Sequence, residues 1–390
     1  MDFIHYGKQT IDRSDIQAVI DALTSDFLTQ GPCIPKFENL LLQYVDARYA
    51  VAVSNATAAL HLSCLALGVS EGDRVWTSPI TFVASSNAAL LCRATVDFVD
   101  IDPDTYNMSV DVLEEKLIQA KKKNKLPKLV IPVHFSGQSC DMKRIHKLSL
   151  VYGFKILEDA SHAIGAFYNE KRVGCCEYSD AAVFSFHPVK IITTGEGGAI
   201  TTNNEKTLKK LSLLKTHGIT RDSNLLFRKN EGSWYYEQVM LGLNYRITDI
   251  QCALGYSQLL RIDDFLKIRK KIVSTYHAGL AECPIKLPIV RENCVSSWHL
   301  YCIQTLDNNR RFVFDELLKN NIGVNVHYIP VHFQPYYKKL GFKPGDFPVS
   351  ESYYKNAITL PLHPGLSEDQ LEYIITCLKK VIYFREPVIS

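Results

Sequence analysis

The chain has 390 residues, of which 46% are apolar and 22% charged, so it can bury a large core and divide into about two domains. Its formal charge of +3 is small for this length, and no basic stripe with interleaved aromatic residues occurs, which argues against a nucleic-acid partner. No apolar run approaches the roughly 20 residues of a membrane span, and the N-terminus lacks the pattern of a signal peptide, so we expect a cytoplasmic protein.

The eleven cysteines are scattered along the chain and contain no C-x-x-C pair. The adjacent Cys175 and Cys176 have no second pair with which to complete a metal site. We therefore expect reduced, mostly buried thiols, with neither a disulfide framework nor a bound metal ion.

The first predicted helix begins at Ser14, where capping-box spacing precedes apolar residues at helical intervals, and extends to about Ser25. Residues 27–37 break this pattern with one glycine and two prolines. By themselves they are more typical of a connector than of a ligand-binding loop.

A short apolar strand at 50–54 leads directly into a helix that starts near Asn55. Free backbone N–H groups and the helix dipole make such a helix start a favourable place for an anion, and phosphate is the natural ligand. Simple capping of the helix by Ser54 or Asn55 explains the same pattern equally well.

A second strand-to-helix unit begins near residue 71, and further strands are predicted at 94–100, 128–133 and 154–157, separated by helical patterns such as that over 110–121. Strands that alternate with helices predict a mostly parallel sheet with helices on both faces. Ligands of such sheets bind beyond the carboxyl ends of the strands. The motifs of this chain fall at those ends.

The predicted strand at 154–157 runs directly into Glu158 and Asp159. A carboxylate at the end of a buried strand is costly unless a cation meets it. A protonated pyridine nitrogen is one such cation. A structural ion pair with a lysine or arginine elsewhere in the chain is the alternative, and for an isolated Glu-Asp pair it is the commoner one.

Lys190 follows a strand-like segment at 181–186 and precedes a glycine-rich turn at 195–198. It lies among hydroxyl-bearing and apolar residues, where loss of solvation lowers the pKa of a lysine toward the range in which the free amine attacks a carbonyl. A lysine that forms a Schiff base needs this environment. Considered alone, a lysine is far more often an ordinary surface residue.

Beyond the glycine-rich turn we expect a strand at 199–202, a helix at 205–215 and an aromatic loop around Trp234. The loop either packs or covers a ligand. One long helical pattern, over about 247–280, is predicted to link a large domain, residues 1–255, to a small one, residues 256–390. The small domain has these predicted elements: strands near 296–304 and 323–328, a helix at 311–320 and a last helix with a capping box at Ser367.

Six ordered motifs resemble those of the sugar aminotransferases of the DegT/DnrJ/EryC1 family. They are Asn55-Ala-Thr57, Phe82, Glu158-Asp159-Ala-Ser-His162, Ser185 with Lys190, Gly195-Glu-Gly-Gly198 and Asn244-Tyr-Arg-Ile-Thr-Asp-Ile-Gln251. The resemblance covers essentially the whole chain. It implies an α/β pyridoxal-phosphate (PLP) enzyme of the aspartate aminotransferase-like fold, fold type I: a mostly parallel sheet flanked by helices, plus a smaller C-terminal α+β domain.

The same resemblance implies roles for individual residues. Lys190 would hold the cofactor and move the proton of the reaction, and Asp159 would keep the pyridine nitrogen protonated. The further cofactor contacts that it implies are Ala56, Thr57, Phe82, His162, Ser185 and Asn244. Phe82 would stack on the ring, and Asn244 would reach the phosphate in the neighbouring subunit, so that the site lies at the interface of a homodimer. The family often has Gln where this chain has His162.

Segments 6–12, 28–32 and 324–328 resemble one branch of the family, which uses L-glutamate to aminate C4 of a UDP-linked 4-keto-6-deoxy-N-acetylhexosamine for pseudaminic acid synthesis. The substrate contacts that this branch implies are Tyr6, Asp26, Phe27, Leu28, Thr29, Ala56, Ser185, Asn325, Val326, His327 and Tyr328. Whether the product ends in flagellin or in a capsule stays open.

Three alternatives remain at this point. The first is an aminotransferase that acts on another nucleotide-linked 4-keto or 3-keto sugar. The second is a sugar 3-dehydratase, in which a histidine replaces the lysine; Lys190 argues against it, although His187 lies close by. The third is a PLP-binding regulator without catalysis, against which the complete set of motifs speaks.

Overall fold

The computed structural model describes residues 2–228, 231–306 and 309–383. Its central sheet has seven strands in the order β1-β9-β8-β5-β4-β2-β3. These are β1 (Tyr49–Val53), β2 (Arg74–Thr77), β3 (Thr95–Phe98), β4 (Leu129–Ile131), β5 (Lys155–Asp159), β8 (Ala181–Ser185) and β9 (Gly198–Thr202). Strand β9 is antiparallel to both of its neighbours and the other pairings are parallel, so the prediction of a mostly parallel sheet is confirmed.

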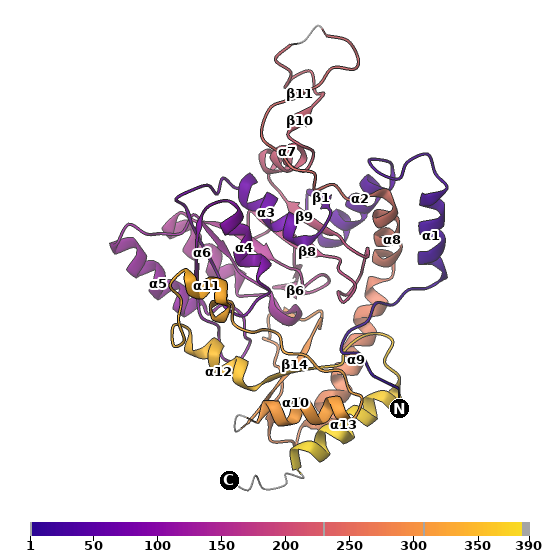
Figure 1. Cartoon of the computed structure of the whole chain (residues 1–390), viewed down its shortest axis with the longest axis vertical. Coiled ribbons are helices and arrows are strands. Elements are labelled where there is room, and N and C mark those ends of the chain that lie inside the picture. Colours follow the sequence, from indigo (N-terminus) through magenta and orange to yellow (C-terminus); the bar gives the residue numbers. More distant parts are fainter. Residues whose placement is uncertain (1, 229–230, 307–308, 384–390) are drawn as a thin grey trace.

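Helices cover both faces of this sheet (Figure 1). Leu129 and Ile131 of β4 pack in one apolar cluster with helices α3 (Ala56–Ala66), α4 (Ala84–Leu91) and α7 (Glu205–Leu214). Val130, between them, packs on the opposite face with α5 (Val110–Lys122) and α6 (Met142–Tyr152). Successive side chains of a strand point to opposite faces, so a continuous apolar strand is buried on both sides.

A third cluster joins β1, β8 and β9 to helices at the other end of the sheet. These helices are α2 (Cys33–Val45) and α8 (Asp249–Leu260), and α1 (Arg13–Leu23) packs against α8. Helix α1 begins one residue earlier than predicted, at Arg13, because Asp12 caps it in a capping box with Asp15.

The single long helix predicted over 247–280 is wrong. The structure has two helices, α8 and α9 (Ile262–Leu280), which meet at Arg261. Arg261 has a non-helical backbone and its guanidinium binds Asp12 and Asp15 at the start of α1. A tertiary contact therefore interrupts a pattern that is helical throughout.

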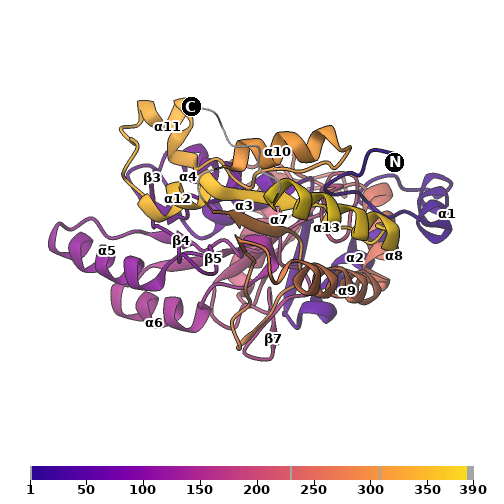
Figure 2. The same ribbon diagram turned by 90° about the horizontal axis from the view of Figure 1, so that it is seen from below.

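The C-terminal part of the chain forms its own apolar cluster around a three-stranded antiparallel sheet, β12-β14-β15. Figure 2 shows α9, α10 and α13 gathered around this part of the chain. The elements are β12 (Ile285–Lys286), β14 (Tyr301–Thr305), β15 (Ala357–Leu360), α10 (Arg310–Lys319) and α13 (Glu368–Tyr383). Helices α11 (Pro335–Lys339) and α12 (Pro348–Asn356) lie outside this cluster, and Tyr337 of α11 packs with α3 and α4. The predicted capping box is present: Ser367 N donates to Gln370 Oε1 at 3.1 Å.

Two details of this region differ from the prediction. Residues 323–328 form no strand, and only Asn325 makes a bridge, to Thr359 of β15. Ile4, near the N-terminus, pairs with Ile322 and packs in the C-terminal cluster. The domain boundaries at residues 255 and 256 stay a prediction.

The remaining short elements lie on connections. They are β6 (Phe167–Tyr168), β7 (Lys171–Arg172), β10 (Ile219–Thr220), β11 (Glu237–Gln238), β13 (Cys294–Val295) and the 3-10 turns η1 (Phe135–Gly137) and η2 (Val331–Phe333). Strands β10 and β11 form a hairpin arm, with described residues 219–228 and 231–238, that projects from the body of the molecule (Figure 1). Among the described residues, none of the helices combines the length and apolar character needed to cross a bilayer.

Candidate active site

A cavity of about 830 Å³ lies where the strands of the central sheet end. Asp159 and Ser185, the last residues of β5 and β8, both line it. The predicted site residues that it brings together are Tyr6, Ala56, Thr57, Phe82, Asp159, His162, Ser185, Lys190, Asn325, Val326, His327 and Tyr328. Motifs that are far apart in the sequence thus meet at the edge of the sheet where parallel α/β proteins bind ligands.

Five predicted site residues do not line this cavity, namely Asp26, Phe27, Leu28, Thr29 and Asn244. All five are exposed in the single chain. They lie near one another in the fold, because Thr29 pairs with Thr248, four residues after Asn244.

The two adjacent carboxylates of β5 have separate environments. Asp159 lines the cavity, where its Oδ2 accepts a hydrogen bond from Ser85 Oγ at 2.6 Å and its Oδ1 accepts one from the Ser161 amide at 3.2 Å. Glu158 is buried elsewhere, with its Oε2 at 2.7 Å from His134 Nε2. The structural ion pair that the sequence left open therefore belongs to Glu158, and its partner is a histidine rather than a lysine or arginine.

Lys190 lines the same cavity as Asp159. Burial of its ammonium group lowers the pKa of Lys190 to about 8, although the attraction of Asp159 opposes the shift. At neutral pH a part of the Lys190 side chains is consequently uncharged, and the free amine can attack a carbonyl. The chain thus presents a nucleophilic amine and a buried acid to one enclosed space.

The start of α3 forms the wall of the cavity beside Ser185. Asn55 Oδ1 caps the helix by accepting the Ala58 amide at 2.8 Å. The amides of Ala56 and Thr57 have no acceptor among the residues that the structure describes. Capping by Asn55 and anion binding are therefore compatible, because the cap uses a different N–H group.

A close approach of β9 holds this helix start in place. A Cβ atom at Gly198 would lie 2.6 Å from the backbone carbon of Asn55 and 2.7 Å from the Ala56 nitrogen. These are distances that packed atoms do not reach, and the obstruction is backbone. Gly198 is thus required for the strand to pass this close to the start of α3.

The imidazole of His162 has a fixed tautomer. Its Nδ1 accepts the Ser136 amide at 3.3 Å, so the proton of the neutral ring is on Nε2, which lies 3.0 Å from Tyr328 Oη. Burial, with smaller contributions from Lys190 and His327, lowers the pKa of His162 well below its ordinary value, which keeps the ring neutral. Tyr328 therefore accepts from His162 and keeps its own hydrogen for a ligand in the cavity.

Sequence reasoning missed Ser85, whose hydroxyl touches Asp159 from helix α4, 74 residues earlier in the chain. The only local signal is its helical spacing from Thr81, whose Oγ1 lies 2.7 Å from Ser85 Oγ. Between them in the sequence, Phe82 is 59% exposed and lines the cavity, and its ring centroid lies 6.4 Å from that of Tyr328.

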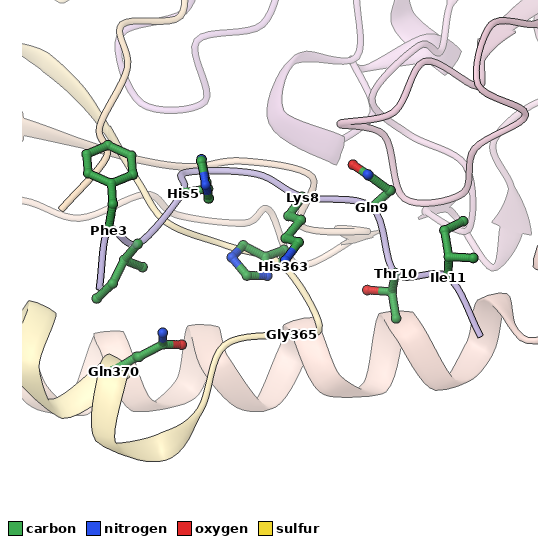
Figure 3. A pocket seen from close by; sticks show the side chains of 10 residues that line it. Phe3, His5, Lys8, Gln9, Thr10, Ile11, His363, Gly365 and Gln370 are labelled. Carbon is green, nitrogen blue, oxygen red and sulfur yellow. The ribbon is translucent and has the colours of Figure 1, made fainter. Parts of the chain in front are cut away.

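A smaller cavity, of about 420 Å³, is lined by the N-terminal segment and by His363, Gly365 and Gln370 (Figure 3). Tyr6 lines the larger cavity, whereas its neighbour His5 and Lys8 line the smaller one with His363. Burial, then the charge of Arg269, lowers the pKa of His363 to about 4. Among the described residues no carboxylate lines this second cavity, so there it lacks the pairing of a lysine with an acid.

Comparison with known proteins agrees with this geometry. The DegT/DnrJ/EryC1/StrS aminotransferase family matches residues 9–379. The chain is 39% identical to the uncharacterized protein MJ1066 of Methanocaldococcus jannaschii over 386 residues, which cover 97% of this chain and 98% of that protein. It is 36% identical to a UDP-4-amino-4,6-dideoxy-N-acetyl-β-L-altrosamine transaminase of Campylobacter jejuni over 383 residues, 97% of each.

The structure of Spr1654 from Streptococcus pneumoniae, in its PLP form, superposes with a TM-score of 0.88 at 32% identity and covers 97% of this chain and 98% of that one. The matched family and the cavity with its lysine and acid support the same conclusion. The chain belongs to the DegT/DnrJ/EryC1/StrS aminotransferase family, whose fold is fold type I, and it is a PLP-dependent nucleotide-sugar transaminase.

Proposed function

We propose that the protein transfers the amino group of L-glutamate to C4 of a UDP-linked 4-keto-6-deoxy-N-acetylhexosamine. The product is UDP-4-amino-4,6-dideoxy-N-acetyl-β-L-altrosamine, for pseudaminic acid synthesis. The observation that carries the chemistry is the meeting of Lys190 and Asp159 in one cavity beside the free amides of α3. The similarity to the Campylobacter jejuni transaminase supports the choice of sugar. Because both substrates are metabolites of the cytoplasm, we place the reaction there.

The residues of the cavity fit the cofactor. The amides of Ala56 and Thr57, with the hydroxyl of Ser185, would hold its phosphate at the helix start. Phe82 would cover the ring, and Asp159 would face the ring nitrogen. When bound, PLP supplies an electron sink for the carbon that loses or gains a proton.

Lys190 has two tasks in this proposal. Its Nζ would hold the cofactor covalently and would be released when the incoming amine takes its place. In the first half-reaction Nζ would be the base that takes the proton from the reacting carbon of glutamate and passes it on to the cofactor. In the second half-reaction it would carry a proton from the cofactor to C4 of the sugar. A pKa of about 8 suits both directions, because neither protonation state is strongly favoured near neutral pH.

The pKa of Lys190 predicts how the apoprotein captures PLP. The pKa is lowered from 10.5 to about 8, so the reactive free amine accumulates as the pH rises through 8. The rate constant should increase about tenfold per pH unit below pH 8 and level off above it. Stopped-flow absorbance measures this rate, and a simple alkylamine measured in parallel corrects for titration of the aldehyde itself. A rate that levels off only near the pKa of an exposed lysine would contradict the burial effect.

The proposed sugar site consists of Tyr6, Asn325, His327 and Tyr328, which bring hydroxyl, amide and imidazole groups to the cavity. Burial, assisted by Lys190, lowers the pKa of His327 to about 3, and its Nδ1 lies 2.8 Å from Thr359 Oγ1. His327 is consequently neutral, as a group that meets sugar hydroxyls should be. Polar neutral groups placed in this way suit a nucleotide sugar.

A panel of UDP- and dTDP-linked 4-keto sugars, offered with glutamate, tests the substrate assignment. We expect the UDP-linked 4-keto-6-deoxy-N-acetylhexosamine to give the highest kcat/KM. A higher value for a dTDP-linked or 3-keto sugar would replace this proposal by the other family substrate. If glutamate fails to change the visible absorbance of the protein loaded with PLP, the proposed amino donor is wrong.

We further propose a homodimer whose active sites lie at the subunit interface. Asn244 and residues 26–29 are exposed and lie outside their own cavity, so they are available to complete the cavity of a second copy. The hairpin arm carries Phe227, which is 95% exposed, and Trp234, which is 74% exposed. Apolar side chains on a projecting arm gain little unless another surface covers them.

Mixing two inactive variants tests this arrangement. Lys190→Ala and Asn244→Ala chains, refolded together, should regain about a quarter of the wild-type activity, because half of the dimers are mixed and hold one intact site each. Each variant refolded alone should remain inactive. Mixtures no more active than the separate variants would place Asn244 in its own subunit's site or outside any site.

A further inference from the structure

Two buried hydroxyl groups, those of Thr81 and Ser85, form a chain of hydrogen bonds that ends on the carboxylate of Asp159 in the active-site cavity. Thr81 Oγ1 lies 2.7 Å from Ser85 Oγ, and Ser85 Oγ lies 2.6 Å from Asp159 Oδ2. The exposed fractions of Thr81, Ser85 and Asp159 are 3%, 1% and 5%. The chain of contacts therefore operates away from solvent, where a hydrogen bond to a charged group is strongest.

The direction of each hydrogen bond follows from the donors that are available. A carboxylate only accepts, so Ser85 gives its single hydroxyl proton to Asp159. Ser85 is then left as an acceptor, and Thr81 donates to it. The bond to Asp159 is charge-assisted, which makes it stronger than a bond between neutral groups.

We propose that Ser85, oriented by Thr81, is the positioning residue that holds the Asp159 carboxylate for its contact with the cofactor ring. Ser85 occupies Oδ2, and the Ser161 amide lies on Oδ1. Two donors on different oxygens fix the plane of the carboxylate, so that its remaining lone pairs keep one direction. Ser85 acts on the cofactor through Asp159.

Without Ser85 the carboxylate would have competing partners. Lys190 interacts electrostatically with Asp159. The hydroxyl of Tyr328 lines the same cavity, and it is uncharged because burial raises the pKa of Tyr328. The imidazoles of His162 and His327 also line this cavity, and burial lowers the pKa of both, so that they are neutral. The other titratable groups of its lining are His187, Glu196, Tyr6 and Tyr245. Rotation of the carboxylate toward Lys190 would remove it from the ring nitrogen.

The experiment compares Ser85→Ala with Ser86→Ala. Both serines are buried in α4 and both lose a hydroxyl hydrogen bond, but Ser86 Oγ lies 2.6 Å from Tyr337 Oη rather than from Asp159. The dissociation constant of PLP from each apoprotein is measured by fluorescence. We expect it to rise about tenfold for Ser85→Ala and to change less than about twofold for Ser86→Ala, as the loss of one hydrogen bond to a charged group implies.

The visible absorbance of each loaded protein is also titrated with pH. Ser85→Ala should shift the midpoint pH of this titration, because the charge at the ring nitrogen influences the bond between Lys190 and the cofactor. Ser86→Ala should leave the midpoint unchanged. Urea unfolding of the apoproteins shows that both variants fold.

Two more variants keep the proposal testable if Ser85→Ala folds poorly. Ser85→Thr retains the hydroxyl and should keep the wild-type dissociation constant and titration. Thr81→Val keeps the shape but removes the donor to Ser85, and should shift both readouts in the direction of Ser85→Ala by a smaller amount. Equal dissociation constants and titrations for Ser85→Ala and Ser86→Ala would overturn the proposal. These readouts need only PLP, so they are independent of the sugar proposed above.

Discussion

Lys190→Ala is expected to lower transamination at least about 10⁴-fold and to remove the covalent bond between protein and cofactor that borohydride reduces. The reason is that, in the proposed mechanism, this one amine both attaches the cofactor and moves the proton at the reacting carbon. PLP should still bind, since the helix start of α3 and Asp159 remain. Initial rates, with borohydride reduction followed by mass measurement of the protein, provide the two readouts.

Lys116→Ala is the matched control for this change. Lys116 is another lysine whose pKa burial lowers, but its Nζ pairs with Asp97 at 2.7 Å and does not line the active-site cavity. We expect Lys116→Ala to lose stability while it keeps the reducible bond and the rate per folded molecule. Turnover of Lys190→Ala at the wild-type rate would refute the catalytic assignment.

Asp159→Asn is expected to lower kcat by about 10²- to 10³-fold, the size of effect seen when one preorganised electrostatic group is removed from an active site. An amide has nearly the same shape as the carboxylate but no charge, so it cannot hold a proton on the ring nitrogen. The electron-withdrawing power of the ring then falls. Absorbance spectra of the loaded protein, recorded together with single-turnover rates for glutamate, would show the change.

The neighbouring residue supplies the control, because Glu158→Gln removes the same charge one position earlier in β5. Glu158 pairs with His134 away from the cavity. Loss of this buried pair should lower the urea midpoint, since a partner of a buried charge is removed, and leave the cofactor spectrum intact. Equal effects of the two changes on kcat would show that Asp159 has no special contact with the ring.

The sequence predicted strands that alternate with helices and form a mostly parallel sheet, and the structure confirmed this prediction. Local patterns were sufficient there, because the strands that form the sheet interior are short apolar runs between helical patterns. The helical pattern over 247–280 shows the limit of this reasoning. Its break at Arg261 depends on Asp12 and Asp15, which lie about 250 positions earlier, as the contacts Arg261 makes with them show.

The candidate site was predicted less completely than the fold. The motif residues that line the cavity came from ordered local motifs, and the sheet topology explains why they meet. Ser85 carries no motif of its own, and its role is visible only because α4 brings its hydroxyl to Asp159. The five predicted residues outside the cavity stay predictions that require a second chain.

By itself the sequence determined the class of fold and predicted Lys190 and Asp159 as site residues, because apolar periodicity and motif order are properties of neighbouring residues. Only the tertiary structure decided that Glu158 pairs with His134 away from the cavity, which nitrogen of His162 carries the proton and how far the pKa of Lys190 falls. These depend on burial and on partners that are distant in the chain, and such contacts exist only once the strands and helices have packed.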